Sequence, residues 1–291
     1  MEENNELIIN ENEQKNEKIK KVFKKVLLIV VPIIVIMFIS FVILKYIGNL
    51  GIIVREYAIY NEKLPSSFDG IKITHFSDLH YNEDSSISKI EKLVEMVNKT
   101  NPDIVIFTGD LIDNDYLISN DTLELIQNNL KKINAKLGKY AIKGEEDNTY
   151  FNKVFDNSNF IILENIVEKI YLGGSYISLL SVDDSYLKDN ISGISENDFL
   201  IALTHMPDLS DRIISDFSPQ LIMAGHSHNG QVRLPLIGPI MKKIGAKKYP
   251  NSHYIIGDTE LFVSGGLGNS KYDFRLFNHP SINFYRLRTI K

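Results

Sequence analysis

The chain has 291 residues, of which 44% are hydrophobic, and a formal net charge of −5. This length allows one large domain or two small ones, and the negative charge gives no electrostatic footprint for nucleic acid. The absence of cysteine excludes a disulfide framework and thiolate metal ligands. A metal site would therefore use His, Asp, Glu and Asn, which suit manganese, iron or zinc.

The first predicted element is an uncharged apolar run from Val26 to Leu44. It is long enough to cross a bilayer as a helix, and Pro32 is compatible with this, because transmembrane helices tolerate proline. A buried soluble helix rarely lacks polar residues for so long. A cleaved signal peptide has a shorter apolar region, and Tyr46–Val54 offers no small-residue cleavage site. We therefore predict one transmembrane signal-anchor helix over residues 26–45.

Charge on either side of this run predicts its orientation. Six lysines precede it, at positions 15, 18, 20, 21, 24 and 25, whereas Lys45 and Arg55 are the nearest basic residues after it. The positive-inside rule then leaves the N-terminus in the cytoplasm and the rest of this single-pass chain outside the cell membrane. Residues 1–25 are rich in Glu and Asn without an apolar period, which predicts a disordered tail. Residues 46–69 are interpreted as a connector to a domain over residues 70–291.

The first half of this domain alternates strands with helices. Short apolar or β-branched runs predict strands at Ile71–Thr74, Asp103–Phe107 and Tyr140–Lys143. Apolar residues at helical spacing predict helices that begin near Ile87 and near Leu123, the second reaching Leu137 with Gly138 at its end. This order is typical of an α/β domain with parallel strands.

The second half is richer in short strands. They are predicted at 160–163, 169–172, 176–182, 199–203, 220–224, 232–234, 254–256, 260–263 and 282–287, with an amphipathic turn at 209–217. We find no internal repeat and no second domain boundary. Two packed sheets flanked by helices are the simplest architecture that accommodates both halves.

Polar clusters follow five of the predicted strands. They are Asp78 and His80, Asp110, Glu145–Asp147, His205, and His226 with His228. Each cluster alone has an ordinary explanation, since a Gly-Asp pair is usually a turn and a lone histidine usually belongs to a core or a surface. Ligands gather at the carboxyl ends of strands in α/β sheets, so five such clusters together predict a metal site.

The number of candidate ligands favours two ions. A single catalytic zinc-type ion usually takes three protein ligands, and this chain offers six candidates before Glu145 is counted. Two ions about 3.5–4 Å apart that share a carboxylate form a clamp for in-line displacement at phosphorus. His75 precedes the first cluster and is interpreted as a core or supporting residue.

The order of the motifs resembles that of the calcineurin-like metallophosphoesterases, over roughly residues 70–290. The family pattern is D-x-H, G-D, G-N-H-[DE], a lone His and G-H-x-H; 225–235 and 262–268 are also similar to its membrane-associated or exported bacterial branch. The resemblance implies a four-layer α/β/β/α sandwich of two mixed sheets. It also implies one ion held by Asp78, His80, Asp110 and His228, and a second held by Asp110, the motif Asn, His205 and His226, with Asp110 as the bridge.

One motif departs from the family pattern, because Gly144-Glu145-Glu146-Asp147 stands where the family has G-N-H-D. Glu145 can still bind a cation, and more strongly than an amide, but its added negative charge weakens the attraction for phosphate. Glu146 replaces a histidine that assists the leaving group. A carboxyl near two cations is ionised, so it has no proton to donate at neutral pH.

These observations predict a membrane-anchored hydrolase of phosphoester or pyrophosphate bonds that uses two divalent ions and a bridging hydroxide, with Glu146, His205 and His228 as the catalytic residues. The alternative from another class is a catalytically impaired phosphoesterase fold that acts in binding or scaffolding at the membrane. The predicted partners are the bilayer and a phosphorylated substrate, for which lipid head groups or cell-wall phosphates fit the location. No nucleic acid is expected.

Overall fold

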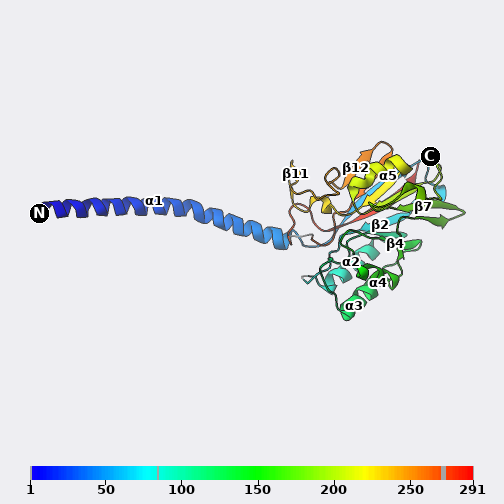
Figure 1. Ribbon diagram of the computed structural model, residues 1–291, viewed down its shortest axis with the longest axis horizontal. Coiled ribbons are helices and arrows are strands. Elements are labelled where there is room, and N and C mark those ends of the chain that lie inside the picture. Colours follow the sequence, from blue (N-terminus) through cyan, green and yellow to red (C-terminus); the bar gives the residue numbers. More distant parts are fainter. Residues whose placement is uncertain (1, 84, 270–272, 291) are drawn as a thin grey trace. The chain divides into compact units, whose positions relative to one another are not determined.

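A computed structural model describes residues 2–83, 85–269 and 273–290 (Figure 1). The chain divides into two compact units, Met1–Ile47 and Gly48–Lys291. The first unit is the helix α1 (Glu2–Val42), followed by a π-helical turn (Ile43–Ile47). From Lys15 to Val42 this helix is long and apolar enough to cross a membrane.

The structure differs from the predicted disordered tail, because α1 already begins at Glu2. Glu, Lys and Gln are strong helix formers, and a helix that is nucleated by the apolar run can extend into such residues at little cost. Lys20 and Glu17, three residues apart on the helix surface, form an ion pair of 3.1 Å that supports this extension weakly. Residue 1 lies outside the described residues.

The second unit contains two six-stranded sheets. The first has the spatial order β1 (Ile53–Asn61), β14 (Ser281–Thr289), β2 (Lys72–Phe76), β3 (Ile104–Thr108), β4 (Gly138–Ile142) and β5 (Ile161–Ile162). β14 and β2 are antiparallel, and the other neighbouring pairs are parallel. The carboxyl ends of β2, β3 and β4 therefore meet at one edge of this sheet.

The second sheet has the spatial order β12 (His253–Ile256), β13 (Thr259–Val263), β9 (Leu221–Ala224), β8 (Leu200–Thr204), β7 (Ser175–Ser181) and β6 (Val167–Leu172). Its four central strands are parallel, and its outer strands β12 and β6 are antiparallel to their neighbours. A small hairpin of β10 (Arg233–Leu234) and β11 (Gly238–Pro239) stands apart from both sheets.

Helices cover the outer face of each sheet. α2 (Ile87–Lys99), α3 (Asn120–Lys131) and α4 (Thr149–Asp156) pack against the first sheet, and α5 (Ser210–Phe217) packs against the second. Short 3-10 helices lie at Ser66–Phe68, Lys188–Asn190, Pro207–Leu209 and His228–Gly230. The predicted four-layer α/β/β/α sandwich of two mixed sheets is confirmed.

The apolar run of β3 shows why the layers form. Val105 and Phe107 face the helices, whereas Ile104 and Ile106 face the second sheet, and all four are fully buried. Alternating side chains on a strand point to opposite faces, so a strand covered on both sides must be apolar throughout.

Three elements were missed or misplaced by sequence reasoning. Residues 53–61, within the predicted connector, form β1, which pairs with β14 along its whole length because its chain is extended and half-buried at the sheet edge. α4 was not predicted at all. α3 ends at Lys131, and Gly138 instead begins β4 with a positive φ of 128° that favours glycine.

Candidate metal centre

The strand ends of both sheets bring all seven predicted ligands together. Asp78 and His80 follow β2, Asp110 follows β3, Glu145 follows β4, His205 follows β8, and His226 and His228 follow β9. They form two groups whose ligand atoms lie within 4.8 Å of one another: Asp78, His80 and His228 in one, and Asp110, Glu145, His205 and His226 in the other. We call these the first and the second donor group.

The first donor group is completely buried and consists of one carboxylate and two imidazoles. His228 Nε2 lies 3.4 Å from Asp78 Oδ1 and 3.1 Å from His80 Nε2. Two ring nitrogens that face each other at this distance can share a proton or can both direct lone pairs to one cation. Asp110 Oδ2 lies 3.5 Å from His80 Nε2, so it borders this group too.

The second donor group is centred on Glu145. Its Oε2 lies 2.8 Å from His205 Nε2 and its Oε1 lies 2.6 Å from His226 Nδ1. Asp110 Oδ2 lies 3.2 Å from His205 Nε2. Since the same Asp110 oxygen is near His80 and near His205, Asp110 has the position that a carboxylate shared by two ions requires.

Three buried atoms of these groups test whether the site fits metal ions. Asp110 Oδ2, His205 Nε2 and His226 Nδ1 are shielded from solvent, and among the described residues they have carboxylate–imidazole contacts but no hydrogen bond of good geometry. Buried polar atoms without partners are costly, unless another group satisfies them. Nitrogen and oxygen donors of this kind suit borderline divalent ions, so the residues fit the two cations that sequence reasoning predicts.

Hydrogen bonds on the far side of each ring orient the histidines. His205 Nδ1 donates to Thr108 O at 2.6 Å, and His226 Nε2 donates to Ile244 O at 2.6 Å. His80 Nδ1 is 2.6 Å from Asp113 Oδ1. Such contacts fix the tautomer that leaves the other ring nitrogen free for a cation. Asp113 was missed by sequence reasoning, and its only signal was its place three residues after Asp110.

The pKa shifts distinguish the two groups. Burial alone would lower the pKa of His205, but the charge of Asp110 and the contact with Glu145 raise it well above its usual value. Burial opposes ionisation of Glu145, yet His205 and His226 hold its pKa well below its usual range. The second group is thus a charge-paired cluster when it holds no cation. In the first group, burial and then the charge of Lys243 lower the pKa of His228 far below its usual value, so its ring is neutral.

A buried arginine supports the first group. The Arg275 guanidinium donates to Gly265 O at 2.8 Å and to Asn269 Oδ1 at 2.9 Å, and its Nη2 lies 3.3 Å from His228 Nδ1. Burial lowers the pKa of Arg275 to about 10, which leaves it charged at neutral pH. Nothing in the sequence pattern had indicated this residue.

The backbone at the site is strained in a consistent way. Asp78, His80, Asp110, His226 and His228 all have positive φ angles, between 45° and 64°. Non-glycine residues rarely adopt this conformation, and its cost is tolerated where it directs side chains to a functional site. Space is equally tight, because a Cβ on Gly144 would collide with the Asp110 carboxylate.

The altered motif has two different roles at the site. The Asp147 carboxylate accepts hydrogen bonds of 2.8 Å from the backbone N–H groups of Asp110, Leu111 and Gly144, so it joins the loops after β3 and β4. Burial raises the pKa of Asp147 to about 7. Glu146 donates its backbone N–H to Asp110 Oδ1 at 3.0 Å, but its half-buried carboxylate has no partner among the described residues.

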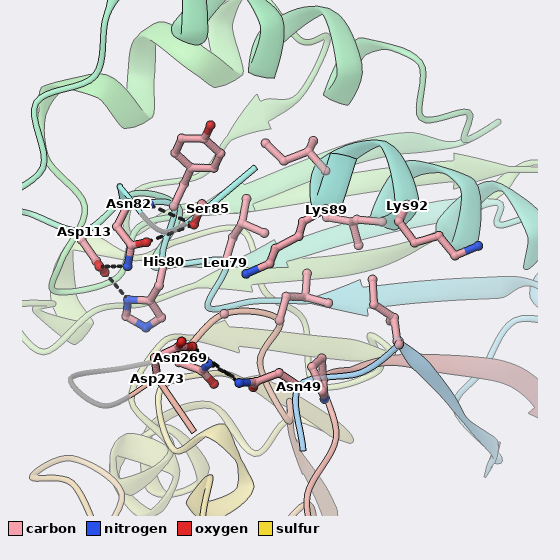
Figure 2. A pocket seen from close by; sticks show the side chains of 18 residues that line it. Asn49, Leu79, His80, Asn82, Ser85, Lys89, Lys92, Asp113, Asn269 and Asp273 are labelled. Carbon is pink, nitrogen blue, oxygen red and sulfur yellow. Dashed lines mark hydrogen bonds and ion pairs between the residues drawn. The ribbon is translucent and has the colours of Figure 1, made fainter. Parts of the chain in front are cut away.

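A cavity of about 280 Å³ borders the first donor group at His80 and Asp113 (Figure 2). Its lining combines apolar side chains such as Leu79 with several amides, two lysines and the carboxylates of Asp113 and Asp273. Figure 2 shows the Lys89 side chain pointing into the cavity and that of Lys92 pointing away. The cavity can therefore take a ligand with an apolar part and a polar part.

The chain is similar in sequence to known metallophosphoesterases. A family model described as "Calcineurin-like phosphoesterase" matches residues 71–230. An uncharacterized metallophosphoesterase of Bacillus subtilis is 30% identical over 84% of this chain and 88% of its own length. A phosphodiesterase of Escherichia coli is 22% identical over 74% and 82%. A zebrafish (Danio rerio) transmembrane protein with a metallophosphoesterase domain is 25% identical over 76% and 54%. A solved archaeal phosphodiesterase has a TM-score of 0.37 at 15% identity, over 67% of this chain and 84% of its own.

Proposed function

The chain belongs to the calcineurin-like phosphoesterase family, and on this basis we propose that it is a membrane-anchored, metal-dependent hydrolase of phosphoester or pyrophosphate bonds. The observation that carries this proposal is the convergence of two donor groups on Asp110, with three buried ligand atoms that have no well-formed hydrogen bond to a described residue. In the proposed centre the first group with Asp110 holds one divalent ion, and the second group holds the other. Manganese, iron and zinc are the candidate metals.

The proposed mechanism assigns a task to each part of the centre. When bound, the two ions supply Lewis acidity that activates water and neutralises phosphoryl oxygens. The Asp110 carboxylate lies between the two donor groups and fixes their spacing, and the backbone N–H of Glu146 donates a hydrogen bond to Asp110 Oδ1. His205 and His228, fixed by their surroundings, steady the geometry. Lys243, whose charge reaches His80 and His228, adds positive charge beside the site for an anionic substrate.

Hydrolysis is tested with the full-length protein in detergent and two soluble substrates, p-nitrophenyl phosphate and its diester, each with added manganese, iron or zinc. Metal-dependent release of nitrophenol that chelator abolishes and metal restores is expected. A purified protein that binds no added manganese, iron or zinc and hydrolyses neither substrate in their presence would contradict the proposal. Metal content per chain, measured independently, shows whether one or two ions are bound.

The partnerless Glu146 carboxylate favours the second candidate function, an impaired phosphoesterase fold used for binding or scaffolding at the membrane. Glu146 stands where a proton donor would assist the leaving group, and an ionised carboxylate gives no such help. Restoring the family motif with Glu145→Asn and Glu146→His separates the two functions. A rise in diesterase activity over an already active parent supports a slowed enzyme, whereas activity only in the restored variant supports the scaffold.

The location of the substrate follows from the proposed anchor. With α1 across the cell membrane and the lysines before it inside, the metal centre faces the outside, where lipid head groups and cell-wall phosphates are available. Protease digestion of intact cells tests this orientation. A catalytic unit that is protected until the cells are lysed would reverse it.

A further inference from the structure

An apolar surface remains uncovered on the domain at the hairpin of β10 and β11. Leu236, Ile237 and Ile244 have relative exposures of 108%, 74% and 80%, and Phe277 beside them reaches 67%. Leu234, Ile240 and Met241 are exposed as well. We call residues 234–244 with Phe277 the hairpin surface. Soluble domains seldom leave so many large apolar side chains together in water, so another partner is expected to cover them.

Backbone hydrogen bonds hold the hairpin surface in a defined conformation. Arg233 pairs with Pro239 across the hairpin, and the Ile240 N–H donates to Val232 O at 3.0 Å. The Arg233 N–H donates to Leu276 O at 3.0 Å, which fixes Phe277 beside the hairpin. The exposed side chains are therefore held outward by a hydrogen-bonded frame.

Positive charge flanks the apolar residues. Lys242, Lys243 and Lys247 follow the hairpin, and none of them forms an ion pair with a residue in the described part of the chain. Large apolar side chains bordered by unpaired lysines are the combination that binds the interface of an anionic bilayer, where apolar groups enter the acyl boundary and lysines meet phosphates.

One hydrogen bond connects the start of the second unit with the loop that supports the hairpin. Asn49, two positions after the unit that contains α1, lies 3.5 Å from Asp273, and Asp273 is three residues before Leu276, which supports the hairpin. The residues with which the second unit begins are therefore linked to the hairpin surface within that unit.

The same surface touches the metal centre. Ile244 is exposed through its side chain, while its backbone oxygen accepts the hydrogen bond from His226 Nε2. Gly245, the next residue, packs against His226 closely enough that a Cβ there would lie 3.4 Å from the ring. A partner that contacts the Ile244 side chain would therefore touch the same residue whose backbone oxygen orients the candidate ligand His226.

From these observations we propose that the hairpin surface inserts into the outer leaflet of the membrane that α1 spans and sets the metal centre against lipid head groups. The inference deepens the proposed function and rests on its anchoring step, but not on hydrolysis. It narrows the substrate class to phosphoesters carried by membrane lipids.

The chain has no tryptophan, so one introduced residue reports on its own surroundings. Ile237→Trp is placed on the hairpin surface, and Leu117→Trp, at a site 84% exposed elsewhere on the domain, is the matched control. Each full-length variant is reconstituted into vesicles of phosphatidylglycerol and phosphatidylcholine, whose lipid acyl chains either are or are not brominated near the head group. Bromine is expected to quench Ile237→Trp several-fold more than Leu117→Trp, and acrylamide to show the opposite order.

Other outcomes overturn the proposal. Equal quenching of both variants by acrylamide, without quenching by bromine, means that the hairpin surface faces water. Protection from acrylamide that depends on the protein-to-lipid ratio, without quenching by bromine, means that a second copy covers it. Because fluorescence needs no turnover, a protein that hydrolyses nothing can still support the inference.

The lipid substrate class has its own test. The double variant Lys242→Glu with Lys247→Glu should lower kcat/KM for a lipid nitrophenyl phosphodiester several-fold more than kcat/KM for the soluble diester. An unchanged ratio of the two kcat/KM values counts against the lipid substrate class.

Discussion

The two donor groups lie side by side yet reach their charge states by different means. The first is enclosed, with Asp78, His80 and His228 almost without exposure. Burial lowers the pKa of His228 and keeps its ring neutral, whereas burial of His80 is outweighed by the contact with Asp113 and the charge of Asp110, which raise its pKa. The second contains Glu145, whose side chain is 31% exposed, and it pairs this carboxylate with a protonated His205. Burial thus keeps one ring of the first group neutral, whereas the second group relies on the ion pair between Glu145 and His205.

This difference explains why the family pattern changes in the second group. An Asn→Glu change in the enclosed group would bury an additional charge at a large cost. Glu145 avoids that cost, since it is partly solvated and contacts two histidines. The second group can therefore accept a carboxylate without loss of fold, while its chemistry is altered.

Asp110→Asn should affect both groups at once, because the Asp110 carboxylate borders His80 and His205. Loss of a shared charged ligand is expected to reduce kcat for a soluble diester by about 10³, the upper range for removal of one stabilising group, and to lower the metal content of the chain. Steady-state kinetics and metal analysis measure these effects. Asp156→Asn, at an exposed position of α4, is the control; normal metal content in Asp110→Asn would refute the bridging position.

Asp113→Asn should weaken only the first group. The Asp113 carboxylate orients His80 through the 2.6 Å contact, and loss of such an orienting partner typically costs about 10–100-fold in metal affinity. Titration of the metal-free protein should show one weakened site and one unchanged site. The neighbouring exposed Asp115→Asn serves as control. Two equally weakened sites would mean that the groups do not act separately.

Arg275→Met should lower the stability of the folded protein. The substitution leaves the carbonyls of Gly265 and Gly268 without their buried donor, and breaking such a network costs about 3 kcal/mol. A lower unfolding midpoint of the full-length protein in detergent is expected by circular dichroism. Arg288→Met removes a surface ion pair with Asp69 and should change the midpoint little.

Sequence reasoning placed the strand ends well, because its signals are local. An apolar run such as 104–107 must be a doubly covered strand, and a polar cluster directly after it marks the sheet edge. The positions of Asp78 and Asp110 therefore followed from the order of the elements together with the family resemblance. All seven candidate ligands lie at such ends.

The supporting residues could not be predicted in the same way. Arg275 comes from the loop between β13 and β14, far along the chain from the other residues of the site, and Asp113 acts through the His80 ring in the loop after β2. β1 is an edge strand whose parallel partner lies more than two hundred residues away, so no local pattern indicates the pairing. Contacts of this kind depend on tertiary packing rather than on periodicity.

His75 provides the reference for the enclosed group, since it lies on β2 just before Asp78 and is neutral through burial without facing either donor group. Its Nε2 is 2.8 Å from Thr108 Oγ1, and burial lowers its pKa from 6.5 to about 3. Between these values the unfolded chain binds a proton that the folded chain does not. The free energy of unfolding is therefore unaffected by His75 above pH 6.5. As the pH falls from 6.5 towards 3, proton binding by His75 in the unfolded chain lowers this free energy by at most about 1.4 kcal/mol per pH unit. Unfolding of His75→Gln from pH 7 to pH 4 should show a smaller loss than the parent, whereas His279→Gln, at an exposed position, should follow the parent. Parallel curves for all three would mean that burial does not keep His75 neutral, and the same explanation for His228 would then fail.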